Sequence, residues 1–150
     1  MPEKFTLQPL LDLMQERTDE ATRQLGQLIA AEQNAKGRLQ LLSQYREEYA
    51  QRFREAQAQG LTLQSWQNYQ EFLARIDEAI TQQDNIVAAS EQKTAEGQQR
   101  WQEQHTRLKA IDTLSVRHWK AQDKKANKLE QKQLDEFSIR SYQRVKDSGQ

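Results

Sequence analysis

The sequence predicts an all-α protein: a long antiparallel two-helix coiled-coil hairpin with a protruding C-terminal helix end. Three observations support this fold class. The composition favours helices, two apolar stripes follow heptad spacing, and one short turn separates them. Hydrophobic residues make up only 35% of the chain and charged residues 29%, which argues against a globular core. The 25 Gln residues accompany Glu, Ala, Leu, Lys and Arg, which are good helix formers, and there are only five Gly and two Pro.

The first apolar stripe predicts a helix from about residue 6 to residue 59. Its positions alternate in steps of three and four, which keeps one face of a helix against a partner helix. Eleven of its fourteen residues are apolar, and Pro9 precedes it, where a first helical turn tolerates proline. The stripe consists of Leu11, Met14, Thr18, Ala21, Leu25, Leu28, Glu32, Ala35, Leu39, Leu42, Arg46, Tyr49, Phe53 and Ala56.

A turn is predicted at residues 60–62. Gly60 can adopt the left-handed conformation that ends a helix, because it has no Cβ. Thr62 can then cap the next helix with its hydroxyl group. A turn this short makes the two helices antiparallel neighbours.

The second stripe predicts a helix from residue 63 to about residue 146. It is more polar through Ser90, Thr94 and Gly97 than elsewhere. Its positions are Trp66, Tyr69, Leu73, Ile76, Ile80, Gln83, Val87, Ser90, Thr94, Gly97, Trp101, Gln104, Leu108 and Ile111. Neither a change in amino-acid composition nor an internal repeat beyond the heptads indicates a second domain, so residues 1–150 are expected to form a single coiled-coil domain.

The two stripes are in register with each other about the predicted turn. Each stripe residue should face the one that lies equally far from Leu61 on the other side of the turn. Phe53 then faces Tyr69, and Leu25 faces Gly97. A frame slip in either helix would have broken this agreement, so the pairing favours one antiparallel hairpin.

The second helix is expected to extend past the start of the first. Apolar spacing continues through Ala126, Leu129, Leu134 and Phe137, while residues 117–146 hold nine Lys/Arg against four Asp/Glu. This end is either a solvated helix terminus or a binding element for an acidic protein groove, a membrane surface or nucleic acid. Nucleic acid is disfavoured, because no recognised binding module is present and acidic residues interrupt the basic ones. The apolar residues favour a protein partner.

Aromatic residues are dense on both sides of the turn. Tyr49 lies on the apolar stripe, where packing explains it. Tyr45 and Phe72 lie one step off the stripes, and together with Leu42, Tyr49, Ile76 and Ala79 they form an apolar patch along the side of the hairpin. The patch either shields the helix interface from water or offers aromatic anchors to a partner.

Signatures of enzymes and of metal sites are missing from the sequence. It has no Cys, no glycine-rich phosphate loop and no nucleophile elbow. His105 and His118 are several helical turns apart, so a shared metal ion is not expected. We therefore expect no catalytic residue, metal or cofactor, and no small-molecule substrate. No apolar run reaches the roughly 18 residues that span a bilayer, and no apolar signal core follows the first residues.

Several segments together resemble the FliJ family of the flagellar type III export apparatus. They are residues 10–13, 21–26, 42–49, Gly60, 66–73, Ala79 with Ile80, Trp101 and 132–137. The combination of spacing, turn position and length carries the resemblance, since no single motif is diagnostic. It implies a coiled coil similar to the central stalk of rotary ATPases, which inserts both termini into the hexameric export ATPase FliI and promotes assembly of its ring.

The resemblance further implies contact with the cytoplasmic region of the export gate protein FlhA and with substrate-free export chaperones. By motif position, the gate-binding patch would be Leu42, Tyr45, Tyr49, Phe72, Ile76, Ala79 and Gln83. The protein would act in the cytoplasm, at the cytoplasmic face of the inner membrane beneath the flagellar basal body. Its membrane contact would be peripheral, through the export apparatus.

The end that would bind the ATPase ring combines the start of the first helix with the basic end of the second. Its expected residues are Leu11, Met14, Arg117, Lys120, Lys124, Lys125, Lys128, Leu129, Lys132, Leu134 and Phe137. Two other functions stay open from the residues alone. A coiled-coil spacer of another complex would need neither the patch nor the basic end, and a nucleic-acid-binding arm would need salt-sensitive binding to RNA or DNA.

Overall fold

A computed structural model describes residues 3–149 as two helices packed against each other. Helix α1 is Gln8–Gln59 and helix α2 is Leu63–Ser148, with no strand among the described residues. The fold is therefore the predicted all-α helical hairpin. Helix α1 begins two residues later than expected and α2 continues two residues further, so both internal helix ends agree with the prediction.

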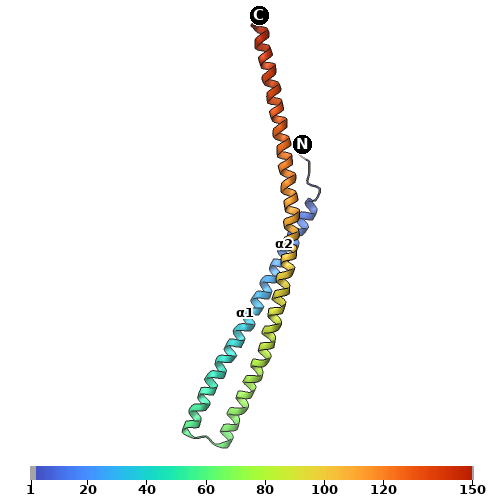
Figure 1. Cartoon of the computed structure of the whole chain (residues 1–150). Coiled ribbons are helices and arrows are strands. Elements are labelled where there is room, and N and C mark those ends of the chain that lie inside the picture. The colour runs from blue at the N-terminus through green and yellow to red at the C-terminus, as the bar shows by residue number, and fades with distance from the viewer. Residues whose placement is uncertain (1–2, 150) are drawn as a thin grey trace. The chain divides into compact units, whose positions relative to one another are not determined.

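The chain divides into two compact units, to which both helices contribute. Residues Thr18–Glu103 form the first, called here the turn unit. The remaining described residues, 3–17 and 104–149, form the terminal unit. Figure 1 shows α1 and α2 side by side within the turn unit. The expectation of a single domain over residues 1–150 stays a prediction.

The turn between the helices has the backbone geometry that the sequence predicts. Gly60 has a φ of +95°, a conformation that residues with a Cβ rarely adopt, and its N–H donates to the carbonyl oxygen of Gln57 at 3.2 Å. The hydroxyl oxygen of Thr62 accepts a hydrogen bond from the backbone N–H of Ser65 at 3.1 Å. This bond caps the first turn of α2, because it satisfies a donor that has no partner inside the helix.

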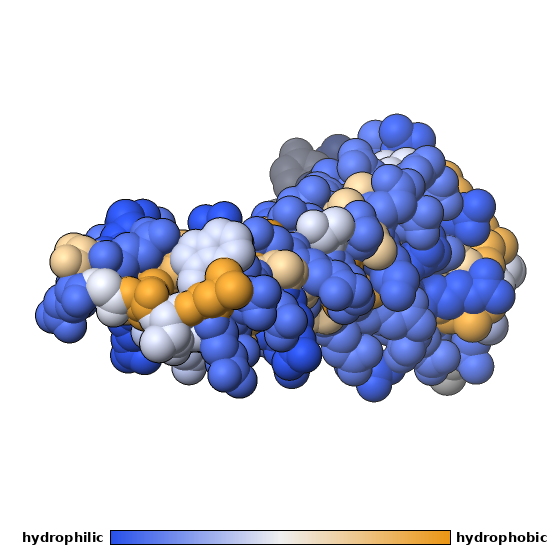
Figure 2. Space-filling view, turned by 90° about the horizontal axis from the view of Figure 1, so that it is seen from below, coloured by the Kyte–Doolittle hydropathy of each residue, from blue (hydrophilic) through white to orange (hydrophobic). Residues whose placement is uncertain are grey.

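The predicted stripes form the helix interface of the turn unit. All their positions in this unit are buried or half-buried except Arg46 and Trp66, which are exposed. The Phe53 and Tyr69 rings, which were predicted to face each other, lie 5.2 Å apart between centroids. Outside the interface the surface is mostly hydrophilic, with small groups of apolar residues, as the view from below shows (Figure 2).

Gly97 allows a close approach of the helices within the more polar part of the interface. A Cβ at this position would lie 2.6 Å from Cδ1 of Leu28 and 3.7 Å from Cδ1 of Leu25, which is the predicted facing residue. Real Cβ atoms do not approach other atoms as closely as 2.6 Å. The missing side chain therefore leaves the space that the leucines fill.

Side chains on the second stripe also form hydrogen bonds with the opposite helix. Gln83 Nε2 donates to the Ala35 carbonyl oxygen at 2.9 Å, and Thr94 Oγ1 donates to the Leu28 carbonyl oxygen at 3.3 Å. Trp101 Nε1 donates to the Thr22 hydroxyl at 2.9 Å. These bonds fix the register, because each requires one particular residue of α1 opposite its donor.

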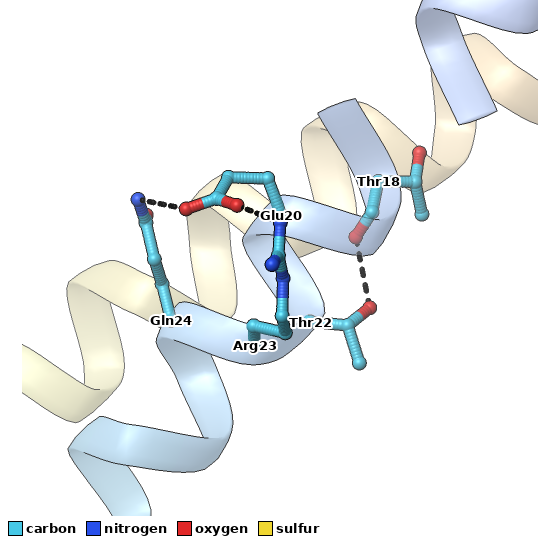
Figure 3. Close-up of polar contacts among 5 residues, drawn as sticks. All are labelled: Thr18, Glu20, Thr22, Arg23 and Gln24. Atoms are coloured by element: carbon cyan, nitrogen blue, oxygen red, sulfur yellow. Dashed lines mark hydrogen bonds and ion pairs between the residues drawn. The ribbon is translucent and has the colours of Figure 1, made fainter. Parts of the chain in front are cut away.

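The acceptor of the Trp101 bond is itself held in place on α1. The Thr22 hydroxyl donates to the carbonyl oxygen of Thr18 at 2.8 Å, so it both donates and accepts (Figure 3). On the outer side, the Glu20 carboxylate accepts hydrogen bonds from Arg23 and from Gln24 (Figure 3). This one-turn network leaves the Thr22 oxygen aimed at the indole N–H.

In the terminal unit, the chain before α1 runs along α2 without helical structure. The Phe5 ring is buried, with its centroid 5.5 Å from that of the His118 ring. The His118 Nε2 atom lies 2.9 Å from the carbonyl oxygen of Glu3, and the Glu3 N–H donates to Gln122 Oε1 at 3.4 Å. His118 and Gln122 thus continue the second stripe past Ile111 as polar residues, at the same alternating steps of three and four.

Opposite effects are expected from alanine at two glycines. Gly37 lies mid-helix with open space around its Cα, so Gly37→Ala should raise the free energy of unfolding by about 0.5–1 kcal/mol. Gly60→Ala should lower it by about 1 kcal/mol, because the positive φ disfavours a Cβ. Urea unfolding followed by circular dichroism measures both changes. A stabilising Gly60→Ala variant would contradict the described turn.

Candidate partner-docking surfaces

A hollow on the turn unit collects most residues of the patch that the sequence predicts. Its volume is about 320 Å³. Five of the seven predicted gate-patch residues line it, together with two charged residues that the sequence analysis did not name. The complete lining is Leu42, Tyr45, Glu48, Tyr49, Arg52, Phe72 and Ile76.

The walls of this hollow differ in how firmly they are held. The Phe72 ring packs on Tyr49 with 4.3 Å between centroids, and Tyr49 packs on Tyr69 at 5.3 Å. Ile76 is buried and closes the floor. By contrast, the Tyr45 side chain is 63% exposed and has neither a ring contact nor a hydrogen bond among residues 3–149. The hollow therefore has one fixed aromatic wall and one wall that is free to adjust.

The other two predicted patch residues lie outside the hollow. Ala79 is half-buried. Gln83 is only 8% exposed and donates its amide N–H to the carbonyl oxygen of Ala35 on the opposite helix. Its described contact is therefore internal, and it holds the helices in register beneath the surface.

Two ion pairs lie near the hollow. Arg46 pairs with Asp77 across the two helices. This hydrogen bond, and then the attraction of the Asp77 charge, raises the pKa of the Arg46 guanidinium. Arg54 lies 3.7 Å from Glu47, atom to atom. Neither pair lines the hollow, so its own charges come from Glu48 and Arg52 alone.

The terminal unit carries a second charged surface, a basic belt at residues 117–128. This range holds five Lys/Arg and a single acidic residue, Asp123. Its basic side chains are exposed and form no ion pair with another described residue. Four of them recur at helical spacing, on a stripe turned away from the residues that face the N-terminal segment. The belt consists of Arg117, Lys120, Lys124, Lys125 and Lys128.

Beyond the belt, α2 carries exposed apolar side chains and equal numbers of basic and acidic residues. Residues 129–149 hold four Lys/Arg, among them Lys132, and four Asp/Glu. Leu129, Leu134 and Phe137 are each more than half exposed, and this end of α2 extends beyond the N-terminal segment (Figure 1). The positive charge expected of the whole protruding end is thus concentrated in the belt.

The predicted ATPase-binding residues of α1 lie inside the helix interface. Met14 is buried and Leu11 is half-buried. Their described environment is packing within the terminal unit. An exposed surface at this end is offered instead by the belt and by the apolar residues of α2.

The described residues contain no group of three or more His, Cys, Asp or Glu placed to hold a metal ion. Within the same residues, neither helix has a stretch long and apolar enough to cross a membrane. The candidate docking surfaces among the described residues are the hollow, the belt and the exposed apolar side chains at the end of α2.

Comparison with known proteins matches this chain to one family over nearly its whole length. The model of the family described as "Flagellar FliJ protein" matches residues 3–147. The chain is 33% identical over 144 residues to the flagellar FliJ protein of Escherichia coli (strain K12), and 31% identical over 144 residues to that of Salmonella typhi. Each alignment covers 96% of this chain and 98% of the relative.

The chain belongs to the FliJ family. The resemblance drawn from the sequence is thereby confirmed, and FliJ membership makes the protein a component of flagellar export and of motility. Nearly equal coverage of both chains means that the FliJ relatives match both the turn unit and the terminal unit.

Sequence spacing missed two residues of the hollow in this FliJ protein. Glu48 and Arg52 follow Tyr45 on the same side of α1, at steps of three and four residues. This spacing is visible in the sequence. It carried no information about partners, however, because charged residues at helical spacing are common on any exposed helix face.

Gln83 should contribute to register more than to net stability. In Gln83→Leu, an apolar side chain of similar size replaces a buried amide, so the free energy of unfolding should change by less than about 1 kcal/mol. Gln83→Ala leaves a cavity and should cost about 2 kcal/mol. Urea unfolding measures both. If the leucine variant unfolds normally but loses gate-protein binding, Gln83 belongs to the docking surface after all.

Proposed function

We propose that this FliJ-family chain is a non-enzymatic, stalk-like adaptor of flagellar protein export. It binds the hexameric export ATPase FliI and promotes its ring assembly, and it links the ring to the cytoplasmic region of the export gate protein FlhA and to substrate-free export chaperones. It works in the cytoplasm, at the inner face of the membrane beneath the basal body. It makes and breaks no covalent bond, and its effect is mechanical and steric.

One observation carries the gate-docking part of this proposal. Five of the seven gate-patch residues expected from the family resemblance line a single hollow of about 320 Å³. Exposed aromatic rings beside an apolar hollow are typical anchors for a protein partner. Shielding of the interface alone requires no such hollow, since Tyr45 is exposed and covers little of it.

The ATPase-binding part rests on the terminal unit. Its belt presents five exposed basic side chains that lack ion-pair partners among the described residues. Beyond it lie apolar side chains on the part of α2 that no segment of α1 covers within this unit. A charged belt followed by an apolar end suits insertion into a ring whose entrance is acidic and whose interior is apolar.

The double variant Tyr45→Ala with Phe72→Ala tests gate docking. It removes both exposed aromatic walls of the hollow and leaves the buried stripe residues in place, so helicity and thermal unfolding should stay nearly unchanged. Binding to the purified cytoplasmic region of the gate protein should be lost, measured by titration calorimetry. Trp66→Ala, which removes an exposed aromatic outside the hollow, is the matched control. Unchanged gate binding in the double variant would reduce the patch to shielding, as in a coiled-coil spacer.

Two variants separate the belt from the apolar end. Truncation after Lys128 removes the apolar end but retains the belt, while Gln at the five belt positions does the reverse. Each should weaken stimulation of the cognate ATPase, the belt variant by lowering the association rate and its salt dependence. Both changes lie in the terminal unit, so the turn unit should stay helical in each variant, as circular dichroism can verify. Full stimulation by both variants would show that this end does not face the ring.

A further inference from the structure

Two charged side chains line the hollow and have no partner of their own. Glu48 and Arg52 form no hydrogen bond or ion pair among residues 3–149. The charges close to them in sequence behave differently, since Arg46 is paired with Asp77 and Arg54 with Glu47. Glu48 and Arg52 are thus the charged residues that line the hollow, and both are available to a partner.

Glu48 also borders a second, shallower hollow beside the first. That hollow has a volume of about 190 Å³ and is lined by Leu41, Gln44, Tyr45 and Glu48. The exposed Tyr45 ring therefore stands between two depressions, and Leu41 offers a further apolar side chain that is 56% exposed. A partner that covers Tyr45 would cover Glu48 with it.

Covering these charges has an energetic consequence. An occupant that fills the hollow removes water from the carboxylate of Glu48 and from the guanidinium of Arg52. Without replacement partners this loss of hydration opposes binding. The two side chains are one helical turn apart, so they can pair either with each other or with opposite charges on the occupant.

We infer that Glu48 and Arg52 select and orient the segment that docks in the hollow. The occupant is an amphipathic helix of the gate protein, with an aliphatic or aromatic side chain that enters the hollow. A basic residue of that helix lies over Glu48 and an acidic residue, one turn away, lies over Arg52. This inference rests on the proposed gate docking and adds the chemistry that the gate segment must have.

The order of the two charges is what such a partner would recognise. Because the negative Glu48 precedes the positive Arg52 by one turn along α1, a helix with its two charges in the reverse order would meet a like charge at each position. Apolar burial supplies affinity in either direction, whereas the charges allow one direction only.

A charge-swap variant tests the inference. Glu48→Arg with Arg52→Glu keeps the net charge and lets the two side chains still pair with each other, but it reverses their order. Affinity for the purified cytoplasmic region of the gate protein should fall at least about tenfold, with helicity unchanged. The matched control is Glu47→Arg with Arg54→Glu, which swaps a paired couple that does not line the hollow and should change affinity less than about twofold.

The outcomes distinguish this inference from the proposed function. If the swap at Glu48 and Arg52 binds normally while the Tyr45 and Phe72 double variant does not, the hollow docks the gate but its charges select nothing. If neither variant loses binding, the gate docks elsewhere and both proposals fail. An equal loss in the control swap would trace the effect to general charge placement and overturn the inference. Loss in the first swap alone supports it.

Discussion

The structure depends on a single line of contact between two helices. Among the described residues no large side chain is completely buried, so there is no core behind the interface that could compensate for a misaligned pair. Each residue of α1 must therefore meet its own partner on α2. Alternating steps of three and four residues keep the stripes facing each other. The turn at Gly60 fixes the register, that is, which residue of α1 faces which residue of α2. The hollow exists because this alignment brings Tyr49 against Phe72.

Much of this could be predicted, because heptad spacing reports directly on which residues face a partner helix. Both frames, the turn and the pairing of Phe53 with Tyr69 followed from spacing alone. The exceptions are informative. Arg46 occupies a stripe position but is exposed, since its long side chain reaches out to Asp77 at the edge of the interface. Trp66 is also exposed, and the register places the small side chain of Ala56 opposite its large ring.

Heptad spacing could not predict how deeply a side chain is buried or which residue it contacts. Spacing placed Gln83 on the second stripe and the family resemblance placed it in the patch, but neither predicted that its side chain reaches a backbone oxygen of the opposite helix. Spacing did not single out Glu48 and Arg52, because a sequence does not show which exposed side chains border a hollow. Heptad spacing also could not predict the position of the N-terminal segment. Phe5 packs on His118 there, but the segment is not helical and so has no helical periodicity.

The hydrogen bonds that cross the turn unit have an evolutionary consequence. Two of their three acceptors, at Leu28 and Ala35, are main-chain oxygens that every amino acid possesses. The side chains at those two positions can therefore be exchanged without removing the acceptor, whereas Gln83 and Thr94 supply the donors and cannot be replaced as freely. For these two bonds the requirement for a particular side chain therefore falls on α2 alone. Relatives that share about a third of their residues can differ at positions 28 and 35 and still keep both acceptors.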